Sequence, residues 1–153
     1  MIKFEKISFE QFKKDILDDR ELYDEMRLPM RATAGAAAYD LPLLQDVELA
    51  PGEIKKIPTG LKAKYPKNVA LLLLVRSRMG FKYNVRMCNQ IGLIDADYYN
   101  NPGNEGHMWI RVQNEGTETV VVKRGDAIAQ AMFINYLTTT DDIAGDKKRS
   151  SDK

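Results

Sequence analysis

The sequence predicts an all-β fold that carries one accessory helix near its N-terminus. From Arg31 onward, short apolar or alternating segments are separated by turns that contain Gly, Pro or Asn, whose backbone freedom or restriction suits turns. The one clear helical pattern lies before this region. Many short strands with frequent turns favour a sandwich, jelly roll or barrel over a doubly wound sheet.

The helical pattern begins at Ser8 and extends to about Met26. Ser8 and Gln11 have the spacing of a capping box, in which the first side chain accepts a hydrogen bond at the helix N-terminus. Apolar side chains recur after it at helical intervals: Phe9, Phe12, Ile16 and Leu17. We expect residues 1–27 to form a helical extension outside the β domain.

The predicted strands occupy most of a β domain over residues 28–140. They are Val47–Leu49, Ile54–Pro58, Leu61–Tyr65, Val69–Arg76, Met108–Asn114, Thr119–Val122 and Ala127–Leu137. The turns between them include PGE at 51–53, NPGN at 101–104 and RGD at 124–126. Residues 141–153 are charged and lack periodicity, so we expect a flexible tail there.

Size and charge limit the classes of function. The 153 residues suffice for one domain that buries roughly 70% of the surface of its unfolded form. A formal net charge of +1 supplies no bulk field for nucleic acid or an anionic membrane, and the longest apolar run, Val69 to Val75, is too short to span a bilayer. One cysteine, Cys88, and an N-terminus unlike a signal peptide favour a cytoplasmic setting. We expect neither a membrane nor a nucleic-acid partner.

The chain lacks the residues that several common kinds of functional site require. The chain contains no GxxxxGK[ST] loop and no GxGxxG after a strand, so the common nucleotide-binding folds are not supported. One histidine, His107, and one cysteine are too few for a dedicated zinc site. No serine triad is evident. The segment after Asp95 resembles the start of an EF-hand loop, but Tyr99 and Asn100 stand where an oxygen ligand and the turn glycine are needed.

Three segments carry candidate chemistry, and each also has a structural interpretation. In VRSRMGFKY, Arg76 and Ser77 follow the most apolar strand, where a cation and a hydroxyl can bind phosphate oxygens. The structural alternative is a solvated rim of Arg76, Arg78 and Lys82. In KRGDAIAQAMF, Gln130 is a polar side chain within an apolar strand, and either a ligand phosphate or another strand could supply its partners.

The third segment, GLIDADYYN, places Asp95 and Asp97 on the same side if the piece is extended. A carboxylate held beside apolar walls can orient and deprotonate a water molecule. Tyr98 offers a flat face against which a sugar or a base could pack. The structural alternative is a hairpin whose aspartates serve its turn.

Four motifs, in this order and at these intervals, resemble one family: the trimeric all-β dUTP diphosphatases, or dUTPases. AAAYDL at 36–41 and RSRMG at 76–80 resemble the first two motifs of that family. NQIGLIDADYY at 89–99 and RGDAIAQ at 124–130 resemble the third and the fourth, and PTG at 58–60 and NPGNEGH at 101–107 add to the match. The resemblance covers the chain from about Leu28 to Asp142.

The resemblance implies a jelly-roll subunit in a homotrimer, with active sites at the boundaries between subunits. It implies Mg²⁺-dependent hydrolysis of dUTP to dUMP and pyrophosphate, with Mg²⁺ held mainly by phosphate oxygens and water, so that the protein itself needs no metal cage. Asp95 is then expected to orient the water that attacks the α-phosphorus. The other expected catalytic positions are Ser77, Arg76 and, as a supporting acid, Asp40.

The same resemblance implies a set of substrate-binding positions. Asn89, with the hairpin positions Gly92 and Ile94, is expected to bind uracil, and Tyr98 to pack against deoxyribose. Gln130 is expected to contact phosphate. The remaining two expected positions, Arg78 and Arg149, are both tied to departures from the family pattern.

Three departures separate this chain from the family pattern. Ala38 replaces a glycine of the first motif, and Arg78 replaces a serine of the second, where it adds phosphate affinity or crowds the site. The tail reads GDKKRSSDK in place of a closing arm such as RGGFGSTG, so that Arg149 is the only candidate for the arm's arginine. Because such an arm excludes water and aligns the phosphates, we expect its loss to reduce turnover severely while leaving nucleotide binding largely intact.

Two further functions stay open beside the enzymatic one. The first is a catalytically weakened protein of the same fold that binds or regulates through deoxyuridine nucleotides, and the second is a dCTP deaminase, whose third motif differs from IDADYYN. The enzymatic interpretation requires that Asp95 adjoins a cavity and is not locked into an unrelated ion pair.

Overall fold

The structure is a computed structural model, and it describes residues 1–149. The predicted flexible tail therefore includes four residues, 150–153, that lie outside the described part of the chain. Within residues 1–149 the elements are, in chain order, β1 (Lys3–Lys6), α1 (Phe9–Asp15), α2 (Arg20–Glu25), β2 (Tyr39–Asp40), β3 (Val47–Leu49), β4 (Ile54–Pro58), β5 (Leu61–Lys64), β6 (Val69–Val75), α3 (Ser77–Tyr83), β7 (Val85–Met87), β8 (Gly92–Ile94), the 3-10 turn η1 (Ala96–Tyr98), β9 (Trp109–Asn114), β10 (Val120–Val122) and β11 (Ala129–Asn135).

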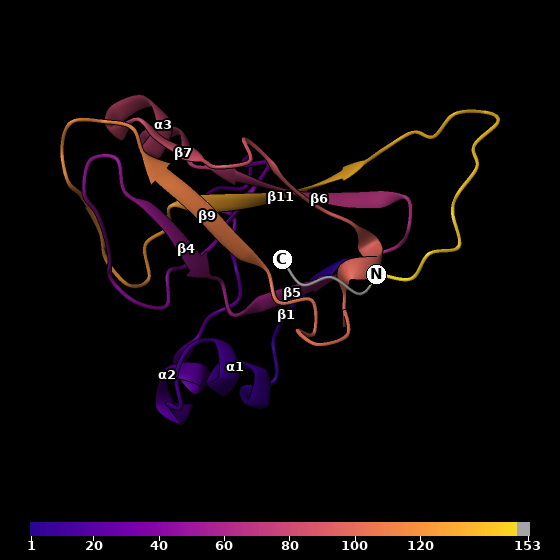
Figure 1. Cartoon of the computed structure of the whole chain (residues 1–153), viewed down its shortest axis with the longest axis horizontal. Helices are drawn as coiled ribbons and strands as arrows, with labels where there is room; N and C mark the ends of the chain where they lie inside the picture. The colour runs from indigo at the N-terminus through magenta and orange to yellow at the C-terminus, as the bar shows by residue number, and fades with distance from the viewer. Residues whose placement is uncertain (150–153) are drawn as a thin grey trace.

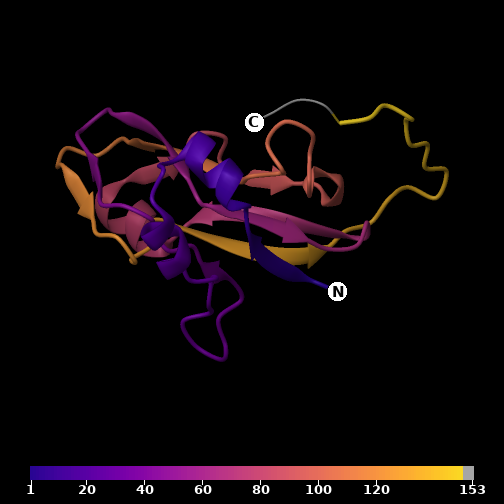
Figure 2. The same ribbon diagram turned by 90° about the horizontal axis from the view of Figure 1, so that it is seen from below.

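The strands form small antiparallel sheets, which confirms the all-β prediction. The largest sheet has the order β2-β11-β6-β8, a second has the order β4-β9-β7, and β1 with β5 and β3 with β10 form two-stranded ribbons. Figure 1 shows α1 and α2 together below the strands and α3 at the opposite end. Seen from below in Figure 2, β6 and β11 run side by side, and their ladder pairs seven residues of each strand.

The core lies around the β6–β11 ladder. Leu71 and Leu73 of β6 and Ala131 of β11 are 0–1% exposed. The apolar run that the sequence placed at Val69–Val75 is buried because β6 is a central strand with a neighbour on each side. None of the helices within residues 1–149 is long and apolar enough to cross a membrane.

The single helix predicted from Ser8 to Met26 is wrong, because the chain forms two short helices there. Ser8 does cap α1, with its hydroxyl 3.1 Å from the backbone nitrogen of Gln11. Asp19 starts a second helix, because its carboxylate accepts a hydrogen bond at 3.0 Å from the backbone nitrogen of Leu22. An acidic N-cap inside an otherwise periodic segment starts a new helix in this way.

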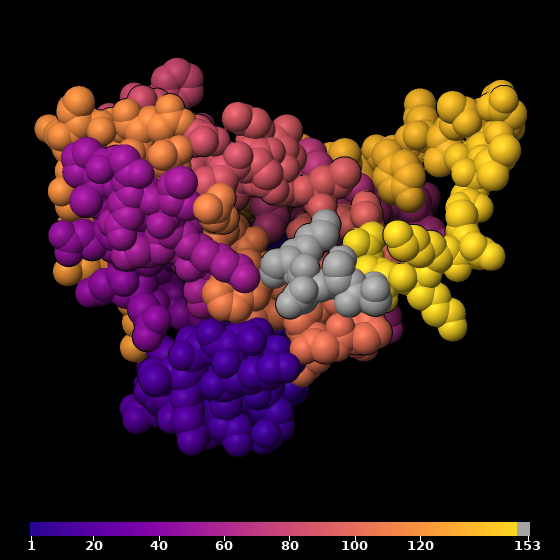
Figure 3. Space-filling view, in the orientation of Figure 1, coloured from indigo at the N-terminus to yellow at the C-terminus, as the bar shows by residue number. Residues whose placement is uncertain are grey.

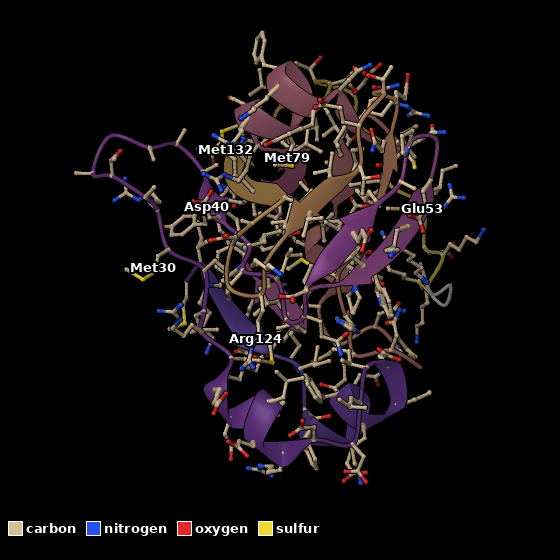
Figure 4. The ribbon with its side chains drawn as sticks, turned by 90° about the vertical axis from the view of Figure 1, so that its left-hand side faces the viewer. Met30, Asp40, Glu53, Met79, Arg124 and Met132 are labelled. Atoms are coloured by element: carbon tan, nitrogen blue, oxygen red, sulfur yellow. The ribbon has the colours of Figure 1, made fainter. Side chains whose placement is uncertain are left out.

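The N-terminal extension is fastened to the β domain at several points. β1 pairs with β5, and Phe12 of α1 is fully buried. Glu25 of α2 forms an ion pair at 2.7 Å with Arg124, which Figure 4 places at the side where the helices meet the strands. Buried residues of the extension, such as Ile7 and Phe12, thus belong to the same core cluster as the strands. The boundary of the extension at residue 27 stays a prediction.

Candidate functional site

A cavity lies beside the turn that connects β7 to β8. This connection is called the hairpin below, although its two strands pair with different neighbours. β8 pairs with β6, with Gly92 opposite Leu73, while β7 pairs with β9. A Cβ atom at Gly92 would lie 3.1 Å from the Cβ of Leu73, so glycine lets the two strands approach closely. The cavity has a volume of about 320 Å³. Its wall includes four of the predicted substrate-binding residues: Asn89, Gly92, Ile94 and Tyr98.

The turn between β7 and β8 borders the cavity through Asn89. Gln90 adopts a left-handed φ of 64° and its nitrogen donates to the carbonyl of Met87 at 2.9 Å, which closes the turn. Asn89 is exposed at this tip. A turn of this shape leaves peptide groups that can read the donor and acceptor pattern of a planar base.

Tyr98 is a buried wall of the cavity, held by its hydroxyl. The side chain is 2% exposed, and its hydroxyl accepts a hydrogen bond from Nδ2 of Asn104 at 2.9 Å and donates to the carbonyl of His107 at 3.3 Å. Gly106 has a φ of +78°, and a Cβ there would lie 2.1 Å from the carbonyl oxygen of Tyr98. Only glycine therefore fits where the loop passes Tyr98.

His107 fastens this loop to the N-terminal extension. Its ring is fully buried, Nε2 accepts from the backbone nitrogen of Gly60 at 2.9 Å, and Nδ1 lies 2.6 Å from Oδ2 of Asp15 in α1. Because Nε2 accepts, the proton of the neutral ring sits on Nδ1 and is donated to Asp15. Burial lowers the pKa of His107, and the hydrogen bond with Asp15 opposes that shift only in part.

The sequence analysis did not predict that Asn104 and His107 support the site. The NPGNEGH segment was noted for its match to a family pattern, but nothing in a single sequence says that Asn104 reaches the Tyr98 hydroxyl. The usable signal was the density of Asn and Gly between Asn100 and Gly106, which is typical of a loop shaped by side-chain to backbone hydrogen bonds.

Asp95 lies at the end of β8 and does not continue the strand. It precedes η1, whose residue Tyr98 donates its backbone N–H to the carbonyl of Asp95 at 3.0 Å. The extended conformation considered for Asp95 and Asp97 is thus replaced by a tight turn. The carboxylate of Asp95 remains 53% exposed and borders a second cavity of about 340 Å³.

The carboxylate of Asp95 is paired with the tail. Nη2 of Arg149 lies 2.7 Å from Oδ2 of Asp95, and Nε lies 2.8 Å from Oδ1 of Asp97. The guanidinium is also 5.9 Å from the centre of the Tyr98 ring. Figure 3 shows the yellow tail folded back against the salmon-coloured segment that contains these residues. The ion-pair partner of Asp95 is therefore the same arginine that the sequence assigned to substrate binding, and its contact with phosphate stays a prediction.

A second group of predicted residues gathers at the other end of β6. Nε of Arg76 lies 3.4 Å from Oδ1 of Asp40, and its Nη1 donates to the carbonyl of Ala127 at 3.3 Å. Gln130 stands opposite Asp40 in the β2–β11 pairing, and its Nε2 donates to the carbonyl of Val75 at 3.2 Å. A neighbouring strand thus supplies one partner of the Gln130 amide. Figure 4 shows Asp40 on the side of the molecule that also carries Met30 and Met132.

Ser77 and Arg78 begin a helix that the sequence analysis did not predict. Both side chains are exposed in the first turn of α3, and Met79 is the buried residue of that helix. The hydroxyl of Ser77 therefore faces outward beside Arg76. A rim of exposed cations and one hydroxyl is compatible with phosphate binding and with plain solvation.

The two groups do not meet within one chain. Ile94 pairs with Leu71 near the start of β6, and Asp95 shares a cavity with Ala70, whereas Arg76 directly follows the other end of β6, six residues after Ala70. At about 3.3 Å per residue, Asp95 and Arg76 are roughly 20 Å apart along the strand. We call the group with Asp95 the hairpin half-site, and the group of Arg76, Ser77 and Gln130, whose phosphate binding stays a prediction, the phosphate half-site.

An antiparallel all-β chain with a cavity beside a tight turn, a carboxylate on a second cavity and a separate cluster of a cation, a hydroxyl and an amide has the groups that an all-β nucleotide hydrolase could use. The sequence profile of the dUTPase family matches residues 24–151. Deoxyuridine 5'-triphosphate nucleotidohydrolases from Lactococcus lactis and Haemophilus influenzae are 40% and 38% identical, over 80% and 86% of this chain and 82% and 84% of theirs. The chain belongs to the dUTPase family.

Solved structures agree with this membership. The crystal structure of dUTPase from Streptococcus mutans is 35% identical, covers 90% of this chain and 98% of its own, and has a TM-score of 0.71. A dUTPase from phage phi11 of S. aureus, described with a structural Mg(II) ion, is 20% identical with a TM-score of 0.67 over 94% of this chain and 96% of its own. The second likeness concerns the fold alone.

Proposed function

We propose that this protein hydrolyses dUTP to dUMP and pyrophosphate, with Asp95 as the base that deprotonates the attacking water. The observation that carries the proposal is the position of Asp95, directly after the strand whose residues line the hairpin cavity. A nucleoside bound in that cavity places its innermost phosphate next to the Asp95 carboxylate. Phosphoanhydride hydrolysis requires this positioning and charge neutralisation more than it requires covalent catalysis.

The hairpin cavity accounts for a preference for deoxyuridine. Backbone groups at the hairpin tip, with Asn89, accept and donate hydrogen bonds in the pattern of uracil, while cytosine reverses that pattern and thymine adds a methyl group. Missing hydrogen bonds in a dry site give large discrimination. Tyr98, held by Asn104, packs against the sugar and leaves little room for a 2′-hydroxyl.

The phosphate half-site comes from a second copy of the chain in a homotrimer. Asp95 and Arg76 of one chain are roughly 20 Å apart along β6, too far to act on one triphosphate. Arg76, Ser77 and Gln130 of a neighbouring subunit would bind the phosphate chain, with Asp40 holding Arg76 through its ion pair. Arg78 adds positive charge on the same rim, and Arg149 moves from Asp95 to the phosphates when substrate binds.

Mg²⁺ enters with the triphosphate, as part of the substrate. Among residues 1–149 no three His, Cys, Asp or Glu side chains form a group that could hold a metal ion. The two acidic site residues, Asp40 and Asp95, lie in different half-sites, so neither half-site alone offers a metal cage. This donor set fits an ion whose ligands are mainly phosphate oxygens and water, and such an ion neutralises charge on the phosphates.

We also place the activity in the cytoplasm. The lone cysteine, Cys88, is free in the structure, which suits a reducing compartment. A net charge of +1 agrees with a small nucleotide as the ligand, since nucleic acid would call for a basic surface.

The ion pair between Arg149 and Asp95 favours a second candidate, a catalytically weakened protein that binds deoxyuridine nucleotides. A base that is neutralised by an arginine cannot take a proton from water until the pair opens. Both carboxylates are more than half exposed, so each contact is worth only about 0–1 kcal/mol and bound substrate can displace it. We therefore rank hydrolysis first.

The test is release of pyrophosphate from dUTP and Mg²⁺ by the wild type, Asp95→Asn and Asp97→Asn. Both variants remove one carboxylate charge and one contact of Arg149, but only Asp95 is assigned to the base. We expect Asp95→Asn to lose activity by about 10³-fold and Asp97→Asn to keep it within a few-fold. Tight binding of a non-hydrolysable dUTP analogue by a wild type that releases no pyrophosphate would establish the second candidate instead.

A further inference from the structure

Tyr65 is a buried tyrosine whose hydroxyl reaches the peptide that carries Asp95. It directly follows β5, is 6% exposed, and its ring packs edge-on against Phe133 with the ring centres 5.6 Å apart. Its hydroxyl donates a hydrogen bond of 2.6 Å to the carbonyl of Ile94. That carbonyl belongs to the peptide group whose nitrogen is the backbone nitrogen of Asp95.

The hydroxyl lies where the β6–β8 ladder ends. Ile94 is the last residue of β8 and pairs with Leu71 of β6. The phenol is thus bonded at the point where β8 gives way to η1, and it fixes the orientation of the peptide from which the Asp95 side chain projects.

The surroundings keep this hydroxyl protonated, so it remains a donor. Burial raises the pKa of Tyr65, and the negative charge of Asp95 raises it further. Both effects favour the protonated hydroxyl, which is the form that donates to the Ile94 carbonyl.

We propose that Tyr65 is a positioning residue for the hydrolytic reaction: it holds the peptide between Ile94 and Asp95 so that the carboxylate keeps its place beside the substrate's innermost phosphate. The role rests on the proposed function of Asp95. Tyr65 lies outside the four motifs by which the chain resembles its family, and it does not line the hairpin cavity. Its effect is therefore expected in the chemical step and not in nucleotide binding.

The experiment compares Tyr65→Phe with Tyr23→Phe. Both changes remove one hydroxyl that donates to a backbone carbonyl at 2.6 Å, since Tyr23 donates to Ile7 in the N-terminal extension. We expect similar small decreases in melting temperature for the two variants. For Tyr65→Phe alone, we expect kcat to fall about tenfold or more, because a misplacement of 1 Å can cost about 100-fold in rate. KM and the affinity for a non-hydrolysable dUTP analogue stay within about twofold.

A second measurement makes the inference independent of activity. Backbone amide NMR signals of residues 95–98 are expected to shift in Tyr65→Phe and to stay in place in Tyr23→Phe. Equal kcat values in the two variants, or unmoved signals at Asp95 and Ala96, would overturn the role of Tyr65. An inactive wild type whose amide signals still respond to Tyr65→Phe would overturn the proposed function and leave the contribution of Tyr65 to the placement of Asp95 standing.

Discussion

The two ends of β6 differ in how much of a site each one completes. At the end near Ala70, Asp95 and Tyr98 are held by groups of the same chain: Tyr65 fixes the peptide before Asp95, and Asn104 holds the Tyr98 hydroxyl. At the end near Val75, the Arg76 side chain is 38% exposed and Phe81 of α3 is 94% exposed. The first end, proposed to bind the nucleoside, is held in place within one chain, whereas the second, proposed to bind phosphate, faces outward.

This difference is tested most strongly by mixing two inactive variants. Asp95→Asn removes the base from the hairpin half-site, and Arg76→Ala removes a cation from the phosphate half-site. We expect each variant alone to lose about 100-fold or more of its pyrophosphate release. If two chains share each site, random assembly of co-expressed variants gives about a quarter of the sites both intact halves, so about a quarter of wild-type activity returns.

The control for this experiment is a mixture that cannot complement. Asp95→Asn combined with a second variant of the same half-site, Asp95→Ala, leaves every site without its base. Activity in the first mixture that does not exceed the average of the two separate variants would mean that one chain builds the whole site. That result would contradict the separation of roughly 20 Å along β6 as the reason for assembly.

Much of the fold was predictable because its strands carry strong local patterns. Val47–Leu49 and Ile54–Pro58 match β3 and β4 at both ends, since each lies between turn residues and alternates in burial. β1, β2 and β7 were not predicted because they are short and gain their pairing from distant partners, such as Lys3 with Lys64. Helix α3 was missed because Arg76 and Ser77 were interpreted as the end of the apolar strand, whereas Ser77 begins the helix.

The site was predictable as a set of residue types and not as a geometry. Asn89 and Tyr98 were assigned to one pocket, and both line the hairpin cavity. The buried supports, Asn104 and Tyr65, could not be found from the sequence, because their partners are 6 and 29 residues away and depend on how loops fold. A single sequence shows which side chains can do chemistry, whereas the groups that hold them in place depend on tertiary contacts.

Because of His107, the folded protein is expected to be less stable at mildly acidic pH. This is the only histidine in the chain, and its folded pKa is lowered, mainly by burial. The unfolded chain, with a histidine pKa of about 6.5, therefore binds a proton more readily than the folded chain does. The free energy of unfolding is expected to fall as the pH decreases from about 7.5 to 5.5. Urea denaturation at several pH values measures this directly.

The matched variant is His107→Gln, which keeps a polar side chain in the loop but does not titrate. It is expected to be less stable than the wild type at pH 7.5 by about 1–3 kcal/mol, because the contact with Asp15 is weakened. Its stability should change little between pH 7.5 and 5.5. Equal pH slopes in the two proteins would show that other groups, such as Glu105, govern the pH dependence of stability.

The smallest expected effect on kinetics follows from removing Arg149, which links the tail to Asp95. Arg149 contacts Asp95 and Asp97 through exposed carboxylates, so these contacts add little stability and open easily. A triphosphate carries more negative charge than the two carboxylates, and it is expected to draw the guanidinium away from them. Arg149→Ala should then raise KM for dUTP by about two- to five-fold and leave kcat within about twofold.

Steady-state kinetics of Arg149→Ala and Lys147→Ala distinguishes the specific effect of Arg149 on KM from a general effect of the positive charge of the tail. Both variants remove one cation from the tail, but only Arg149 reaches Asp95 among the residues that the structure describes. Lys147→Ala should keep the wild-type KM. A KM that falls in Arg149→Ala would contradict this expectation. It would show that the arginine competes with substrate at the Asp95 end of β6, so that the tail blocks the hairpin half-site instead of binding the phosphates.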